Sequence, residues 1–152
     1  MALADFLKKN EAKLKIEDIE KFEKSYRVQL PESMKGIYLQ QNGGYLFRCG
    51  NPDFDLPLKN LYPINNPFRE TGNTINKLLD EQKMDGLIPL NLVPFCSDEA
   101  GDNYYIRTDV SGYGKIYYIF SEFFDDFLEN QEAYCVADSF DEFDAMIGKI
   151  ED

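Results

Sequence analysis

A change of hydrophobic periodicity at residues 42–44 constrains the fold of this chain more than any other feature. Before Asn42, apolar residues recur three to four positions apart, as on one face of a helix. After Gly44, large apolar residues follow one another over residues 45–47, as in a strand. Asn42 and Gly43 both tolerate left-handed backbone geometry at a helix end. We therefore predict a helix, a sharp corner and a strand, in that order.

Hydrophobic spacing predicts four helices. They cover residues 16–26, the segment from Pro31 to Asn42, residues 74–83 and the C-terminal stretch 139–150. Pro31 suits the first helical position because its missing N–H would be unpaired there anyway. Ser139 and Glu142 form a capping box at the start of the last helix. A further helix could extend the domain at residues 1–15.

The central part of the chain has the pattern of antiparallel strands. Residues 103–108 alternate Tyr104 and Ile106 against Tyr105, and residues 115–120 are dense in β-branched and aromatic side chains. The glycine-containing loop between them predicts a hairpin. Further strands are expected before Ser97 and at the stretch LYPIN, where Pro63 would confine the strand to an edge. We predict a single α+β domain over residues 1–152, with a mainly antiparallel sheet flanked by N-terminal and C-terminal helices.

Composition excludes several kinds of active site. The chain has no histidine, which rules out Ser-His and Cys-His nucleophile pairs and histidine metal ligands. Its three cysteines, Cys49, Cys96 and Cys135, lie too far apart for a paired metal motif and are odd in number. We interpret them as small buried hydrophobes, and we expect no cofactor and no metal.

The net charge of −12 limits the partners of this protein. Such a chain would repel nucleic acid and anionic lipid over most of its surface, but it favours encounter with a basic protein. No apolar run approaches the ~18 residues of a membrane span, and the first ten residues lack the apolar stretch of a signal peptide. We expect a cytoplasmic protein that contacts neither nucleic acid nor membrane directly.

Two glycine-rich turns and one acidic loop are the candidate ligand sites. Neither glycine turn has the sequence or the element order of a phosphate-binding loop. The loop at residues 97–103 carries Asp98, Glu99 and Asp102, but its spacing does not match an EF-hand. We predict a strand-joining turn in which Gly101 supplies backbone freedom and Asp102 accepts local N–H bonds. An untyped Mg²⁺ or Ca²⁺ site is the alternative.

The interval between Lys115 and Lys149 contains no basic residue. Acids are interleaved there with aromatic side chains. The acids are Glu122, Asp125, Asp126, Glu129, Glu132, Asp138, Asp141, Glu142 and Asp144. One interpretation is a solvated helix face above buried Phe residues. The other is a surface for a basic partner, since unneutralised acid repels itself.

The order and spacing of several short motifs point to a known family. The motif positions are Leu30, Pro31, Asn42, Gly43, Gly44, Gly101, Asp102, Gly114, Phe140 and Phe143. Together they resemble the SUKH superfamily, which contains bacterial immunity proteins and Smi/Knr-type regulators of fungal cell-wall synthesis. The resemblance covers Ile16 to Ile150 and is weak over residues 48–86. One feature differs: in the family, the strand after the glycine turn often leads into a polar dipeptide, where this chain has FSEFF.

This resemblance implies a protein-binding α+β domain with no established catalytic centre. Bacterial members of the superfamily typically neutralise a toxin of a polymorphic toxin system, and that toxin is often a nuclease. Our first hypothesis is an immunity protein that binds a basic toxin in a stoichiometric complex. The expected contact residues are Asp98, Glu99, Asp102, Phe124, Asp125, Asp126, Glu129 and Glu132. The alternatives are a scaffold or regulatory interaction module, and a carboxylate-dependent hydrolase with at least two converging acids in a pocket.

Overall fold

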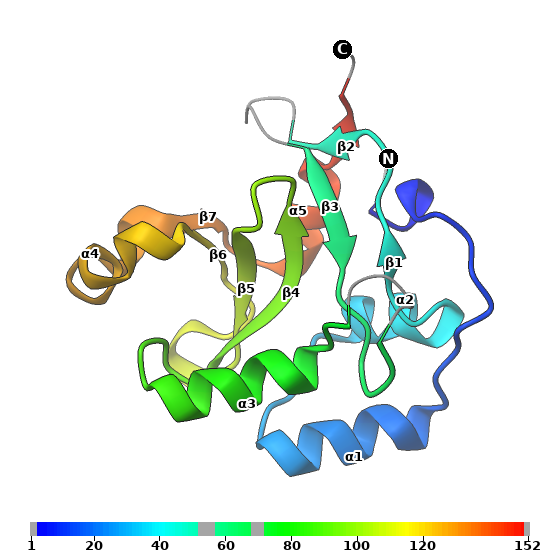
Figure 1. The fold of residues 1–152 in the computed structure, drawn as a ribbon, viewed down its shortest axis with the longest axis horizontal. Helices are drawn as coiled ribbons and strands as arrows, with labels where there is room; N and C mark the ends of the chain where they lie inside the picture. Colours follow the sequence, from blue (N-terminus) through cyan, green and yellow to red (C-terminus); the bar gives the residue numbers. More distant parts are fainter. Residues whose placement is uncertain (1–2, 52–56, 68–71, 151–152) are drawn as a thin grey trace.

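The structure is built around a six-stranded antiparallel sheet (Figure 1). The computed structural model describes residues 3–51, 57–67 and 72–150. The strands, in spatial order, are β1 (Gly44–Tyr45), β3 (Leu58–Leu61), β4 (Leu92–Asp98), β5 (Asn103–Arg107), β6 (Ile116–Ile119) and β7 (Cys135–Ala137). A separate ladder pairs β2 (Cys49–Gly50) with β8 (Gly148–Lys149). The predicted α+β fold is confirmed.

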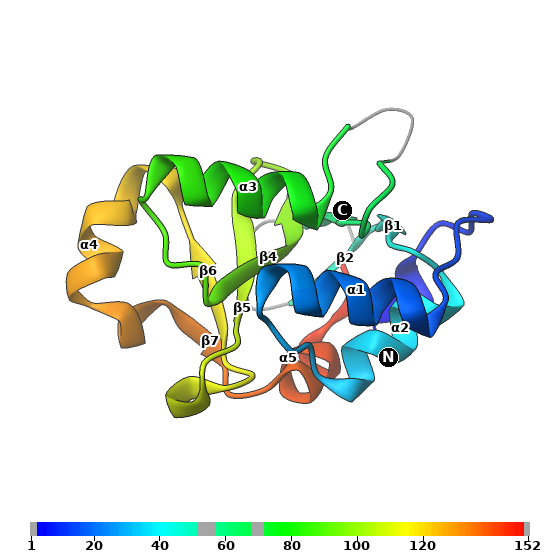
Figure 2. The same ribbon diagram turned by 90° about the horizontal axis from the view of Figure 1, so that it is seen from below.

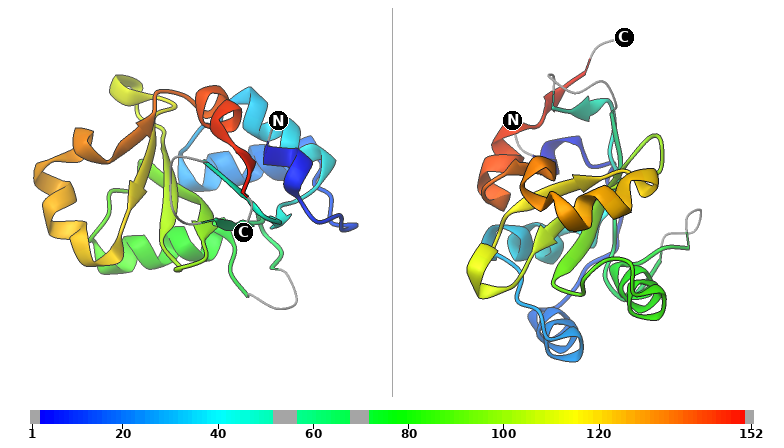
Figure 3. Two further views of the ribbon diagram at one scale, coloured as in Figure 1. Left: turned by 90° about the horizontal axis from the view of Figure 1, so that it is seen from above. Right: turned by 90° about the vertical axis from the view of Figure 1, so that its left-hand side faces the viewer.

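Helices cover both faces of the sheet. Helices α2 and α5 lie on one face and α3 on the other, while α1 lies across one end (Figures 2 and 3). The α-helices are α1 (Ile16–Tyr26), α2 (Glu32–Gln40), α3 (Ile75–Asp85), α4 (Phe124–Glu129) and α5 (Phe140–Met146). Short 3-10 turns are η1 (Leu3–Phe6), η2 (Val110–Gly112), η3 (Ser121–Phe123) and η4 (Gln131–Tyr134).

The predicted alternation in β5 divides the interior into two hydrophobic clusters. Tyr104 and Ile106 face the larger cluster, to which the helices α1, α2, α3 and α5 contribute. Tyr105 faces the smaller one, together with Tyr117 and Phe127. Because successive side chains of a strand point to opposite faces, one strand pair serves both clusters.

Helix α5 is positioned by aromatic contacts with the sheet. The Phe143 ring meets the Phe95 ring edge-on, with centroids 5.5 Å apart, and lies 5.3 Å from that of Tyr104. Phe140 is 1% exposed and packs 5.9 Å from Phe95. Ser139 is the N-cap of this helix, and its Oγ accepts a hydrogen bond from the N–H of Glu142 at 3.0 Å; the Glu142 carboxylate accepts the N–H of Asp138 at 3.4 Å, so only one of the two bonds of the predicted capping box is made as expected.

The corner after α2 depends on the side chain of Asn42. Its amide donates to the carbonyl of Ile64 and accepts from the N–H of Ile64, both at 2.8 Å, and the residue is 1% exposed. Gly43 has φ +71°, and a Cβ there would lie 2.5 Å from the carbonyl oxygen of Leu61. The corner is therefore a packed junction between α2, β1 and the end of β3.

Several element boundaries differ from the predictions. Pro31 is the N-cap of α2 and not its first helical residue. The strand expected at LYPIN lies earlier, at Leu58–Leu61, and is interior to the sheet, because it ends before Pro63 and pairs on both sides. The last helix stops at Met146, after which the chain pairs with β2.

The N-terminal region forms η1 and then an extended segment. Leu7 forms an antiparallel bridge with Leu46 next to β1, and the N–H of Leu3 donates to Asp144 Oδ1 of α5 at 2.6 Å. In the weakly matching segment 48–86, the described residues form β2, β3 and α3, while residues 52–56 and 68–71 lie outside the described residues. All three cysteines are free, and burial raises the pKa of Cys49 to about 12.

Two glycine substitutions test the packed corner. Gly43 and Gly86 have similar φ angles, +71° and +67°, but only Gly43 has backbone atoms where a Cβ would be placed; at Gly86 that space is open. Gly86→Ala should lower the free energy of unfolding by about 1 kcal/mol, the cost of left-handed geometry alone. Gly43→Ala should cost about 3 kcal/mol or more in urea denaturation, because it adds a backbone clash. Equal losses would contradict the close approach to Leu61.

Candidate protein-binding surface

Five of the nine acids of the C-terminal interval lie on a short helical segment beside the sheet, and the other four lie in or just before α5. We call residues 121–134, comprising η3, α4 and η4, the acidic lobe; it follows β6 and forms one end of the molecule (Figure 1). Phe127 attaches the lobe to the smaller cluster and is 1% exposed. Its ring meets the rings of Tyr117 and Tyr134 edge-on, at 5.9 and 5.7 Å. The lobe is therefore held by a buried aromatic contact.

The structure places the lobe's predicted contact acids at the surface, with different surroundings. Asp126 accepts hydrogen bonds from Tyr134 Oη and, at 3.0 Å, from Asn130 Nδ2; the first of these raises the pKa of Tyr134. Glu132 pairs with Lys115 at 3.4 Å. Asp125 and Glu129 are exposed, and their side chains have no hydrogen-bonding or cationic partner among residues 3–51, 57–67 and 72–150. These two carboxylates are the ones available to an incoming partner.

The predicted aromatic contact, Phe124, is not among the exposed apolar side chains of the lobe. Phe124 is half-buried and packs against the smaller cluster. Phe123 and Leu128 are instead 47% and 50% exposed, next to the acids. The sequence pattern does not single out Phe123 or Leu128, because Phe123 and Phe124 each have helical spacing to Phe127. Periodicity alone does not say which of the two rings faces inward.

Asp98 is a correction to the predicted contact set. It is 1% exposed, and its Oδ1 accepts hydrogen bonds from the N–H groups of Ala100 and Asp102 at 2.9 and 3.0 Å. Its Oδ2 accepts the hydroxyl of Tyr118; burial and this carboxylate raise the pKa of Tyr118. A buried carboxylate is tolerated only when such bonds satisfy it. Asp98 therefore forms the turn, which is the role predicted for Asp102.

The remaining turn acids lie near the beginning of the lobe. Glu99 is exposed and Asp102 half-buried in the turn between β4 and β5, where Gly101 has φ +89°. Asn103 pairs with Ile119, so this turn and the first lobe residues leave the sheet at the same end. Glu132 pairs with Lys115 at the opposite end of β6. The length of β6 separates the two ends by about 10 Å. The predicted contact residues thus form two groups and not a single patch.

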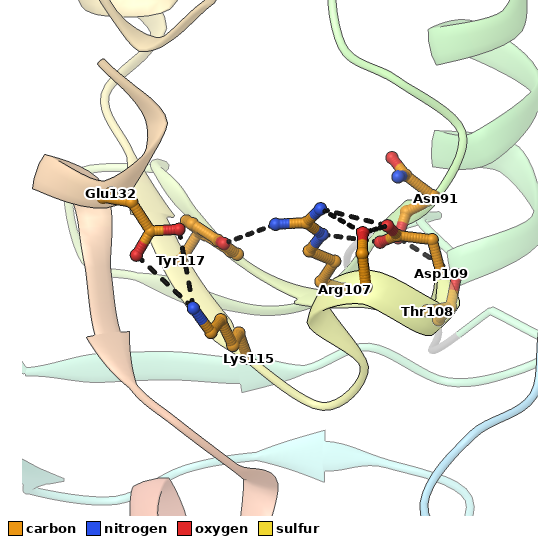
Figure 4. A network of polar contacts seen from close by, with 8 residues as sticks. Asn91, Arg107, Thr108, Asp109, Lys115, Tyr117 and Glu132 are labelled. Atoms are coloured by element: carbon orange, nitrogen blue, oxygen red, sulfur yellow. Dashed lines mark hydrogen bonds and ion pairs between the residues drawn. The ribbon is translucent and has the colours of Figure 1, made fainter.

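A polar network that sequence analysis did not find supports the lobe (Figure 4). The Arg107 guanidinium bonds Asp109 through Nε at 2.5 Å and Nη2 at 3.0 Å, and donates through Nη1 to the hydroxyl of Tyr117 at 3.2 Å. Arg107 holds the pKa of the Asp109 carboxyl well below its usual range. The Tyr117 ring packs on Phe127 in turn. A Cβ on Gly112 would lie 2.5 Å from Arg107 Cζ, so a larger residue at this position would displace the guanidinium from the network.

The described residues also limit the other kinds of site. Within residues 3–51, 57–67 and 72–150, no group of three His, Cys, Asp or Glu side chains could hold a metal ion. The shift of the Asp109 pKa favours a permanent anion, whereas a general acid needs a raised pKa. None of the helices in these ranges combines the length and the apolarity needed to cross a bilayer.

The fold and the surface describe a class of protein: an α+β domain with an antiparallel sheet, flanking helices and an acidic helical lobe. A family model described as the SMI1 / KNR4 family (SUKH-1) matches residues 13–145, so the chain belongs to this family. A crystal structure of a protein from Pseudomonas syringae pv. tomato superposes with a TM-score of 0.47 and 14% sequence identity, over 76% of each chain. No curated protein matches the sequence.

Substitution of Asp109 tests the network that supports the lobe. The side chain of an unfolded Asp has a pKa of about 3.9, and the pKa of Asp109 in the folded protein is lower. The Arg107–Asp109 pair therefore stabilises the fold above about pH 4. This stability is lost as the pH falls toward the folded-state pKa. Asp109→Asn should lower the free energy of unfolding by about 1–2 kcal/mol at pH 7. Its difference from wild type should shrink in urea titrations below about pH 4.

The control for this prediction is Asp85→Asn. Asp85 is exposed, and its side chain has no ion-pair or hydrogen-bond partner within the described ranges. Its substitution should change the free energy of unfolding by less than about 0.5 kcal/mol at either pH. A loss for Asp109→Asn that stays constant down to low pH would show that the Asp109 charge does not contribute to stability.

Proposed function

We propose that this protein is an immunity protein, which neutralises a cognate bacterial toxin by binding it in a stoichiometric complex. Membership in the SMI1 / KNR4 family supports this proposal, as does the net charge of −12. A nuclease toxin must be basic where it grips phosphate, and an acidic protein can occupy that surface and exclude the substrate. Inhibition by occupation requires no catalysis and no cofactor, so we propose neither for this chain.

The observation that carries the proposal is that two of the predicted contact acids on the acidic lobe, Asp125 and Glu129, have no partner for their carboxylates within the part of the chain that the structure describes. Asp125 and Glu129 are exposed beside Phe123 and Leu128, each of which is about half exposed. Protein interfaces commonly combine apolar or aromatic anchors with a polar rim. The lobe offers both on one short segment. Because Phe127 and the Arg107 network hold this segment in place, little ordering entropy would be lost on binding.

Electrostatic steering gives this complex a kinetic signature. A strongly acidic surface and a basic toxin would associate at rates up to about 10⁸–10⁹ M⁻¹s⁻¹ at low salt. Glu99 and Asp102, at the nearby turn, would add to the same field. We place this encounter in the cytoplasm, where an incoming nuclease would meet its substrate. Because salt screens exposed charges over about 10 Å at 0.1 M, the association rate should drop as salt is added.

Co-expression tests the immunity function directly. The toxin domain encoded beside this gene would be expressed in a heterologous bacterium, with and without the present chain. We expect growth to be restored when both are made, and a one-to-one complex to elute in size-exclusion chromatography. Unchanged growth inhibition would contradict immunity against that toxin, and would favour an interaction module that acts on another partner.

Charge-neutralising variants test whether the acidic lobe makes the contact. Asp125→Asn combined with Glu129→Gln should lower the association rate by about threefold to tenfold at low salt, because two steering charges are removed. The control combines Glu11→Gln with Glu20→Gln, which removes the same charge from exposed positions outside the lobe. This control should reduce the rate by less than about twofold. Equal reductions in stopped-flow measurements would show that only net charge matters.

A further inference from the structure

A cleft of about 770 Å³ lies between α1 and α3, on other elements than the acidic lobe. The two helices run side by side in both Figure 1 and Figure 2. The lining residues include three cations, Lys21, Arg27 and Lys83, against one carboxylate, Asp80. The cleft therefore has the opposite sign to the chain as a whole, which carries −12.

The three cations are not used within the described fold. Each is exposed, and none has an anionic partner within residues 3–51, 57–67 and 72–150. By contrast, two lysines outside the cleft form ion pairs: Lys35 with Glu23 at 3.2 Å, and Lys115 with Glu132 at 3.4 Å. Asp80, the lining carboxylate, already accepts a hydrogen bond from the hydroxyl of Tyr26 at 3.0 Å. Positive charge therefore remains available in the cleft.

The backbone of Arg27, at the edge of the cleft, is held in a left-handed conformation that arginine does not favour, whereas asparagine tolerates it. Arg27 ends α1 with φ +55°, and Asn65 in the opposite wall has φ +69°. Glycine would hold the left-handed geometry of a helix end without a steric penalty. The Arg27 side chain makes no ion pair within the described ranges that would offset this penalty. A ligand for the guanidinium in the cleft would explain why arginine, and not glycine, is found at this left-handed helix end.

The remaining lining residues give the cleft a defined shape. Phe22 and Leu79 are buried at its base, while Leu90 is 44% exposed. Asn76 is fixed against Asn65, accepting its N–H at 2.8 Å and donating to its side-chain oxygen at 2.9 Å. Helix α1 has 11 residues and is about 16 Å long, the span of about five extended residues. Mixed charged and apolar lining of this length suits an extended peptide.

We propose that the cleft between α1 and α3 binds an acidic, extended peptide segment of a protein partner. Carboxylates of the segment would pair with Lys21, Arg27 and Lys83, and an apolar side chain between them would contact Leu90. This site lies on other elements than the acidic lobe and takes a partner of the opposite charge. The domain would then have two docking surfaces, and the second does not depend on the first.

Binding of a defined acidic peptide tests this site. The probe is a fluorescein-labelled peptide of about eight residues with alternating Glu and Leu, long enough to span the cleft. Fluorescence anisotropy with the full chain should show binding that weakens as salt is added. The triple variant Lys21→Gln, Arg27→Gln and Lys83→Gln should weaken binding by at least about tenfold. No binding to the wild-type chain at low salt would overturn the proposal.

A matched control separates the cleft from net charge. Lys13→Gln, Lys24→Gln and Lys77→Gln remove the same charge at exposed positions outside the cleft lining. This variant should bind the peptide within about twofold of wild type. Equal weakening by the two triple variants would overturn the proposal. The lobe variant, Asp125→Asn with Glu129→Gln, should bind the peptide as tightly as wild type, which keeps the result independent of the immunity function.

Arg27→Gly distinguishes a ligand-binding arginine from a simple helix end. Glycine relieves the left-handed backbone, so the variant should unfold at a higher urea concentration than wild type. It should nevertheless bind the peptide several-fold more weakly, because one cation of the cleft is lost. Unchanged peptide affinity in this variant would contradict a role for Arg27 in the cleft.

Discussion

The two buried hydrogen bonds between the Asn42 side chain and the backbone of Ile64 are the constraint on which the rest of the fold depends. They join the end of α2 to the chain that leaves β3, two segments that are 22 residues apart. Leaving the N–H and carbonyl of Ile64 unpaired inside the protein would cost about 1–3 kcal/mol for each group. With this junction fixed, Gly43 passes close to the Leu61 carbonyl and β1 pairs with β3. The sheet is extended from that pairing.

Local patterns predicted those elements whose signals lie within a few residues. The hairpin of β5 and β6 follows from alternation and a glycine loop, and α3 begins at the cap residue Thr74 and ends at Gly86, close to its predicted bounds. The interior position of β3 was not predictable in this way, because it depends on pairing with β1 and β4. The same holds for β2, whose partner Lys149 lies a hundred residues from Cys49 along the chain.

The candidate surface was predicted in part for the same reason. The run of acids without a basic residue is visible in the sequence, and the structure exposes Asp125 and Glu129. The burial of Asp98 could not be read from its loop, since the Tyr118 hydroxyl that satisfies it comes from another strand. The cleft between α1 and α3 was also missed. Its cations come from two helices, and only the packing of those helices brings Lys21 and Lys83 to one cleft.

Hydrogen–deuterium exchange of the toxin complex would test the central claim most directly. The full chain would be compared free and bound to the toxin partner that the proposed function requires, with peptides covering the whole sequence. If the acidic lobe is the contact surface, amides of residues 121–134 should exchange more slowly in the complex, while those of α1 remain unchanged. Slower exchange at other segments, with no change in residues 121–134, would contradict binding through the acidic lobe.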